Sequence, residues 1–155
     1  SLPVQVMFSP GHTMASVTYI VGDAAFVHDT LIMPDSGTSR ADFPGGSSAA
    51  LYNSLQRILA LPPETRLYVG HDYATGRPAA CMATVAQHRA TNIHLADVPD
   101  QATFQETRDA RDATLALPKL MLAALQVNIR GGRAPDPEGN GRRYLKVPMD
   151  YLEER

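Results

Sequence analysis

Three residues that make good metal ligands follow predicted β-strands: His12 in SPGHT, Asp29 in HDT and His71 in GHDY. Strand ends in a layered α/β domain converge on one edge, so ligands that are 17 and 42 residues apart could meet there. Imidazole nitrogens and carboxylate oxygens suit zinc or ferrous iron, and two histidines with one carboxylate leave positions open for a substrate or dioxygen. A structural or exposed role is the competing interpretation for each histidine.

The long loop over residues 29–46 carries a charged pair, Arg40 and Asp42. A loop of this length without secondary structure is typically functional or disordered. The two side chains could form an ion pair that fixes the loop. In a regular strand, His28 would point to the face opposite Asp29, so we expect it to pack or to support a ligand.

The elements that must position these residues alternate between strands and a helix. Apolar and β-branched runs predict strands at residues 4–8, 16–21, 24–28 and 66–70, the middle two joined as a hairpin. Leucines and isoleucine at helical spacing predict a helix that begins at Ser47 or Ser48 and stops before Pro62. This order indicates a layered α/β domain.

Beyond residue 74 the sequence is mostly helical in character. We expect polar helices at residues 84–94 and 103–115, and structural or exposed roles for His88 and His94. A third, apolar helix is predicted to start at Pro118, and its Met and Leu side chains are expected to form core. The prediction is a single partial domain over residues 1–155, with an αβ part at 1–73 and a helical extension and tail at 74–155.

Composition narrows the classes of function. Of 155 residues, 44% are hydrophobic and 19% are charged, and the formal net charge is -2, so there is no basic surplus for binding nucleic acid. No apolar run approaches the ~20 residues that a membrane-spanning helix needs, and the first residues lack the features of a signal peptide. We therefore expect a cytoplasmic protein that binds neither nucleic acid nor membrane.

Four motifs in order resemble the second half of the metallo-β-lactamase superfamily: SPGHT before a hairpin, DT, GTSRADFPGG before a helix, and LYVGHDY. The resemblance covers residues 4–73, and NGRRYLKVPM near the end matches more loosely. It is greatest to the persulfide dioxygenase and glyoxalase II-like branch, whose loop carries Arg-x-Asp-Phe, here residues 40–43. The implied fold is α/β: the second half of an αββα sandwich plus a C-terminal helical extension.

The resemblance also implies roles for individual residues. His12 and Asp29 would bind the first metal, Fe(II) or Zn(II), and Asp29 would bridge to a second ion where two are present, since a carboxylate has two oxygens. His71 would bind the second metal in dinuclear members and stand beside the site in mononuclear iron enzymes. Asp29, Tyr73 and Arg40 are the catalytic candidates, the last two near the substrate.

One part of the family pattern is absent. The leading His-x-His-x-Asp-His motif should precede SPGHT, but eleven residues come before His12 and no His-x-His occurs in the sequence. Three ligands are too few for the usual site, because metal affinity depends on ligand number and geometry. We expect this chain to be one half of a roughly doubled protein, inactive alone, whose sheet is covered by the missing N-terminal half or by a second copy in a homo-oligomer.

Three functions are consistent with the sequence. The first is a persulfide dioxygenase that uses ferrous iron on a glutathione-linked sulfur substrate, and the Arg-x-Asp-Phe loop favours it. The second is a zinc-dependent ester or thioester hydrolase of the glyoxalase II type, in which the metal activates water. The third is an inactive half-domain that binds a partner. Metal content and the reaction catalysed would separate them.

Overall fold

A computed structural model describes residues 1–97 and 100–147 of the chain. The chain divides into two compact units, residues 1–114 and the part from Leu115 onward. The first unit contains β1 (Gln5–Phe8), β2 (Val17–Val21), β3 (Ala24–His28), α1 (Ser48–Leu59), β4 (Arg66–Val69), β5 (Met82–Thr84), α2 (Val85–Thr91) and α3 (Gln101–Asp112), and the second contains α4 (Met121–Asn128).

The five strands form one sheet in the order β1-β2-β3-β4-β5. β3 and β4 are parallel, whereas the other neighbouring strands are antiparallel. β1 and β3 therefore point the same way, because both are antiparallel to β2, and β4 shares their direction. The carboxyl ends of these three strands lie at one edge of the sheet, which is the arrangement the candidate site requires.

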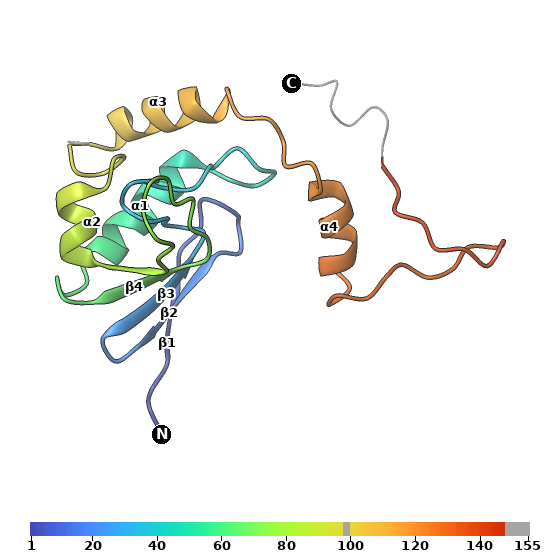
Figure 1. Cartoon of the computed structure of the whole chain (residues 1–155), viewed down its shortest axis with the longest axis horizontal. Helices are drawn as coiled ribbons and strands as arrows, with labels where there is room; N and C mark the ends of the chain where they lie inside the picture. Colours follow the sequence, from blue (N-terminus) through green and yellow to red (C-terminus); the bar gives the residue numbers. More distant parts are fainter. Residues whose placement is uncertain (98–99, 148–155) are drawn as a thin grey trace. The chain divides into compact units, whose positions relative to one another are not determined.

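One face of the sheet is covered by α1. Leu51, Leu55 and Ile58 of this helix are fully buried, as are Val27 and Leu67 of the sheet. Each such side chain contributes roughly 2 kcal/mol of hydrophobic stabilisation. Figure 1 shows α1 between the sheet and α3. The helix begins as predicted, with the Ser47 hydroxyl accepting a hydrogen bond from the Ala50 amide.

The opposite face of the sheet carries a row of apolar side chains. The row follows the strand register across all five strands and consists of Val6, Tyr19, Phe26, Tyr68 and Met82. Phe26 and Tyr68 stack with ring centroids 5.2 Å apart. Tyr19 and Phe26 are each nearly half exposed, so no described residue covers them as α1 covers the other face. We call these five residues the open row.

The second unit differs from the sequence expectation. α4 begins at Met121 rather than at Pro118, and it has no buried residue. The prediction that its Met and Leu side chains form core is wrong, since Leu125 is 57% exposed. The described part of this unit has a single short helix and irregular chain, too little to enclose an apolar face. The helices predicted at residues 84–94 and 103–115 correspond to α2 and α3 and belong to the first unit. No helix in the described ranges is long and apolar enough to cross a bilayer.

Candidate metal centre

His12, Asp29 and His71 lie together at the edge where β1, β3 and β4 end. His12 Nε2 is 3.9 Å from Asp29 Oδ2, and His71 Nε2 is 3.5 Å from Asp29 Oδ1. Ligand atoms bound to one zinc ion at bond lengths of about 2.0–2.2 Å are themselves separated by about 3.4 Å. The separations are therefore close to those of shared ligation, and the carboxylate presents a different oxygen to each of these two imidazoles.

The environment of His12 fixes which nitrogen faces the site. Its Nδ1 lies 2.8 Å from the main-chain oxygen of Arg40. A carbonyl only accepts, so Nδ1 donates, and in the neutral ring Nε2 then carries the lone pair. Two electron-pair donors, His12 Nε2 and Asp29 Oδ2, thus face each other, an arrangement that a cation between them stabilises. Metal-binding histidines commonly donate their other N–H to a backbone carbonyl in this way.

The Arg40 side chain pairs with Asp42 in a bidentate geometry. Nε is 2.6 Å from Oδ1 and Nη2 is 2.7 Å from Oδ2, and the guanidinium lies over the Phe43 ring. The hydrogen bond to Asp42 raises the pKa of Arg40 and keeps it charged. These contacts agree with the loop-fixing alternative, because they hold the peptide whose oxygen orients His12. A role for Arg40 near the substrate stays a prediction.

The same loop is anchored to α3 by a buried ion pair. The Ala41 amide donates to Asp112 Oδ2 at 2.7 Å, while Arg108 Nη2 lies 2.6 Å from Asp112 Oδ1. Arg108 also donates to the main-chain oxygen of Thr38. Both charged side chains are almost fully buried, so removing one partner would leave an unpaired charge in the protein interior.

Asp29 is confined by the strand beside it. A Cβ on Gly70 would lie 2.6 Å from Asp29 Oδ1, so only glycine leaves room for the carboxylate in this position. His28, just before Asp29, has a φ of +51° and follows a register shift between Phe26 and His28. The expectation that His28 points away from Asp29 is wrong: its Nδ1 is 3.5 Å from Asp29 Oδ2, because the bulge interrupts the alternation of a regular strand.

Sequence reasoning missed Arg77, which ties two loops of the site together. Its guanidinium forms paired hydrogen bonds to Asp35, at 2.6 and 2.8 Å, and to Asp72, at 2.9 and 2.7 Å. Asp72 also accepts from the Ala80 amide. The hydrogen bonds from Arg77 lower the pKa of both carboxyls. The loop that carries His71 is thereby held to the loop after Asp29. An arginine within ATGRPA gives no sequence signal of such a role.

The remaining candidates take different positions. Tyr73 is 63% exposed, and its ring centroid lies 6.3 Å from that of His71, so its hydroxyl is available to a bound molecule. His94 Nδ1 accepts from the Thr38 amide at 2.9 Å. His88 is fully buried, which lowers its pKa to about 4. Both of these histidines have structural positions.

Across residues 1–97 and 100–147, no group of three or more His, Cys, Asp or Glu side chains could hold a metal ion by itself. Three imidazoles lie near Asp29, yet the set is incomplete without further ligands. A metal bound here therefore requires donors from beyond the described residues.

Comparisons with known proteins decide the family. No protein-family model matches the sequence. The beta-lactamase hydrolase-like protein of Xylella fastidiosa (strain Temecula1) is 61% identical over 154 residues, which is 99% of this chain and 36% of that protein. The crystal structure of ETHE1 from Myxococcus xanthus is 35% identical with a TM-score of 0.75, over 86% of this chain and 56% of that chain. The chain belongs to the metallo-β-lactamase superfamily.

Within the metallo-β-lactamase superfamily the chain falls in the ETHE1 and glyoxalase II-like branch, as the motifs predicted. A hydroxyacylglutathione hydrolase of Shewanella baltica (strain OS185) is 37% identical over 87 residues, 56% of this chain and 32% of that protein. The crystal structure of TTHA1623 in a di-iron-bound form is 34% identical with a TM-score of 0.50, over 59% of this chain and 42% of that one. The chain spans between about a third and just over half of these proteins, and it corresponds to their C-terminal part. The predicted fold class is confirmed.

Proposed function

We propose that this chain is part of a longer, metal-dependent enzyme of the metallo-β-lactamase fold that acts on glutathione-linked sulfur compounds. The observation that carries the proposal is the position of Asp29, whose two oxygens face the Nε2 atoms of His12 and His71 at 3.9 and 3.5 Å. Similarity to a hydroxyacylglutathione hydrolase and to ETHE1 supports the class of substrate.

The donor set fits a resident metal ion. Imidazole nitrogen with carboxylate oxygen suits Fe(II) or Zn(II), and His12 already has the tautomer and the carbonyl partner that a ligand needs. Asp29 would bridge two ions or bind one. A bound metal supplies an electrophilic centre that can orient a substrate sulfur or carbonyl and activate dioxygen or water. Asp29 and His12 would hold the ion, and the exposed Tyr73 hydroxyl would hydrogen-bond the substrate next to it.

Persulfide dioxygenation is the first candidate reaction. Dioxygen would oxidise the outer sulfur of glutathione persulfide, which with one water yields sulfite and glutathione. Similarity to the ETHE1 structure and the Arg-x-Asp-Phe loop at residues 40–43 support this reaction. In it, a single iron would be held by His12, Asp29 and a histidine from outside this chain, with His71 beside the site.

Thioester hydrolysis is the second candidate, and the proximity of His71 to Asp29 supports it. His71 Nε2 lies 3.5 Å from Asp29 Oδ1, so these two side chains would hold a second ion together with further ligands. Water attack on the carbonyl of an acyl-glutathione would break its C–S bond and release a carboxylic acid and glutathione.

The two candidates are separated by the metal content and the turnover of the longer enzyme purified without added metal. One iron per chain, with oxygen consumption on glutathione persulfide, supports dioxygenation. Two zinc ions, with cleavage of an acyl-glutathione thioester, support hydrolysis. In either case Asp29→Ala should abolish both metal and activity, whereas Asp109→Ala, on the exposed face of α3, should change neither. A metal-free enzyme that turns over neither substrate would refute the proposal and favour the inactive half-domain.

We also propose that the open row is covered by the rest of the longer enzyme. The five residues of the open row form one continuous apolar surface across the sheet. Exposing such a surface to water is unfavourable, and a second layer of secondary structure from the longer enzyme would bury it. In hydroxyl-radical footprinting of the longer enzyme, Tyr19 and Phe26 should react as slowly as the buried Phe104. If Tyr19 and Phe26 react as fast as the exposed Tyr144, this face of the sheet is open to solvent. If they are protected and the enzyme has the mass of a dimer, a second copy of the protein covers the open row.

A further inference from the structure

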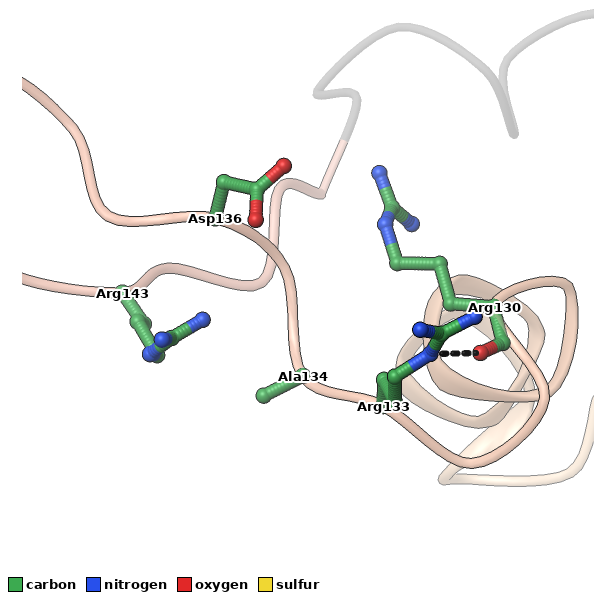
Figure 2. Close-up of a pocket in the computed structure, with 5 residues that line it drawn as sticks. All are labelled: Arg130, Arg133, Ala134, Asp136 and Arg143. Atoms are coloured by element: carbon green, nitrogen blue, oxygen red, sulfur yellow. Dashed lines mark hydrogen bonds between the residues drawn. The ribbon is translucent and has the colours of Figure 1, made fainter.

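The unit from Leu115 onward contains a hollow of its own, with a volume of about 590 Å³. Its lining comes from one short stretch of chain: Arg130, Arg133, Ala134, Asp136 and Arg143. Three guanidinium groups outnumber the single carboxylate, so the hollow is positively charged although the chain as a whole is slightly acidic. We call it the arginine hollow (Figure 2).

Hydrogen bonds beside the arginine hollow fold the chain back toward α4. Gln126 of α4 exchanges two hydrogen bonds with Lys146, donating to its carbonyl oxygen at 2.7 Å and accepting from its amide at 2.8 Å. A turn closed by the Glu138 amide and the Arg142 oxygen reverses the chain between these points. Figure 2 shows Arg143 on a chain segment separate from the one that carries Arg130 and Arg133, with the Arg133 side chain turned toward the Arg130 carbonyl oxygen.

Each guanidinium is oriented by a backbone oxygen. Arg130 donates to Gln126, Arg133 donates to Arg130, and Arg143 donates to Pro135. A guanidinium has five N–H donors, so each keeps further donors for a ligand. Among the described residues none of these three arginines forms an ion pair with a carboxylate, in contrast to Arg40, Arg66, Arg77 and Arg108 of the first unit, which pair with aspartates.

We propose that the arginine hollow binds a compact anion with at least two negative charges on oxygen, either a phosphate monoester or a small polycarboxylate. Planar guanidinium forks match phosphate and carboxylate oxygens in bidentate fashion. Asp136 offsets one of the three positive charges, and the two that are left match a divalent rather than a monovalent anion. The volume lies in the range of small-molecule sites.

Calorimetric titration of the metal-free longer enzyme tests this inference. Inorganic phosphate and citrate serve as the two probes, in separate titrations at one fixed ionic strength, because exposed charges are screened by salt. We expect one saturable site per chain for at least one probe. Binding of phosphate alone would identify a phosphate ester as the ligand class, and binding of citrate alone would identify a polycarboxylate. Since the protein holds no metal in this experiment, its outcome does not depend on the function proposed above.

Two variants and a matched control assign the binding to the arginine hollow. Arg133→Gln and Arg143→Gln should each weaken binding about tenfold, the effect of losing one charge-assisted contact. Arg142→Gln removes the same charge from an exposed neighbour that does not line the hollow, and it should change the affinity less than twofold. Absence of saturable binding for both probes, or an equal loss in Arg142→Gln, would overturn the proposal. Unchanged thermal midpoints would show that the variants fold.

Discussion

Replacing Gly70 with alanine tests how the Asp29 carboxylate is held. The new Cβ would lie 2.6 Å from Oδ1 and 3.6 Å from Cγ of Asp29. Because ordinary van der Waals contacts start at about 3.5 Å, the oxygen must move by roughly 0.9 Å, and Oδ1 is the atom that faces His71. Supporting residues that orient metal ligands typically change metal affinity about 10–100-fold when they are altered. We expect a loss of that size in Gly70→Ala.

The assay is competition with a chromophoric chelator on the longer enzyme, with circular dichroism to show that the variants fold. Gly139→Ala is the control, because a Cβ at residue 139 would meet nothing within 4 Å. The reasoning is refuted if Gly70→Ala binds metal as tightly as Gly139→Ala does.

Three further predictions concern the elements around the site. Arg77→Gln removes the ion pairs to Asp35 and Asp72. We therefore expect this variant to have a lower thermal midpoint and faster amide hydrogen exchange over residues 71–80. The control variant Arg89→Gln, on the exposed face of α2, should show neither change. Burial lowers the pKa of His88 from 6.5 to about 4, so on acidification the unfolded chain binds a proton at His88 at a higher pH than the folded chain does. The free energy of unfolding should therefore fall as the pH drops from 6.5 to 4, by at most about 3 kcal/mol, and urea titrations of His88→Leu should show a flatter dependence. Ser47→Ala should cost about 1 kcal/mol in urea denaturation, and an unchanged midpoint would contradict its role as the N-cap of α1.

The elements that local signals determine were predictable. The β2–β3 hairpin and α1 follow from a Gly-Asp turn, β-branched runs and a serine cap, and the structure confirms the bounds of both strands and the start of α1 within one residue. β5 is only three residues long, and its pairing with β4 depends on contacts that no local pattern records. The apolar residues of α4 were predicted to be core, but burial requires a partner surface that a sequence pattern cannot supply.

The convergence of His12, Asp29 and His71 was predictable because the directions of β1, β3 and β4 determine which strand ends share an edge. The groups that support them were not predictable. The Arg40 carbonyl reaches His12 across 28 residues, and Arg77 reaches Asp35 across 42. Such contacts depend on the paths of irregular loops, which composition and periodicity leave undetermined.

The most direct measurement is anomalous diffraction at the iron and zinc edges from crystals of the longer enzyme. We predict a peak within about 2.2 Å of both His12 Nε2 and an Asp29 carboxylate oxygen. A second peak beside His71 would indicate the dinuclear hydrolase. A bound metal located elsewhere, with His12 Nε2 and Asp29 free of it, would contradict the assignment of this edge of the sheet as the metal centre.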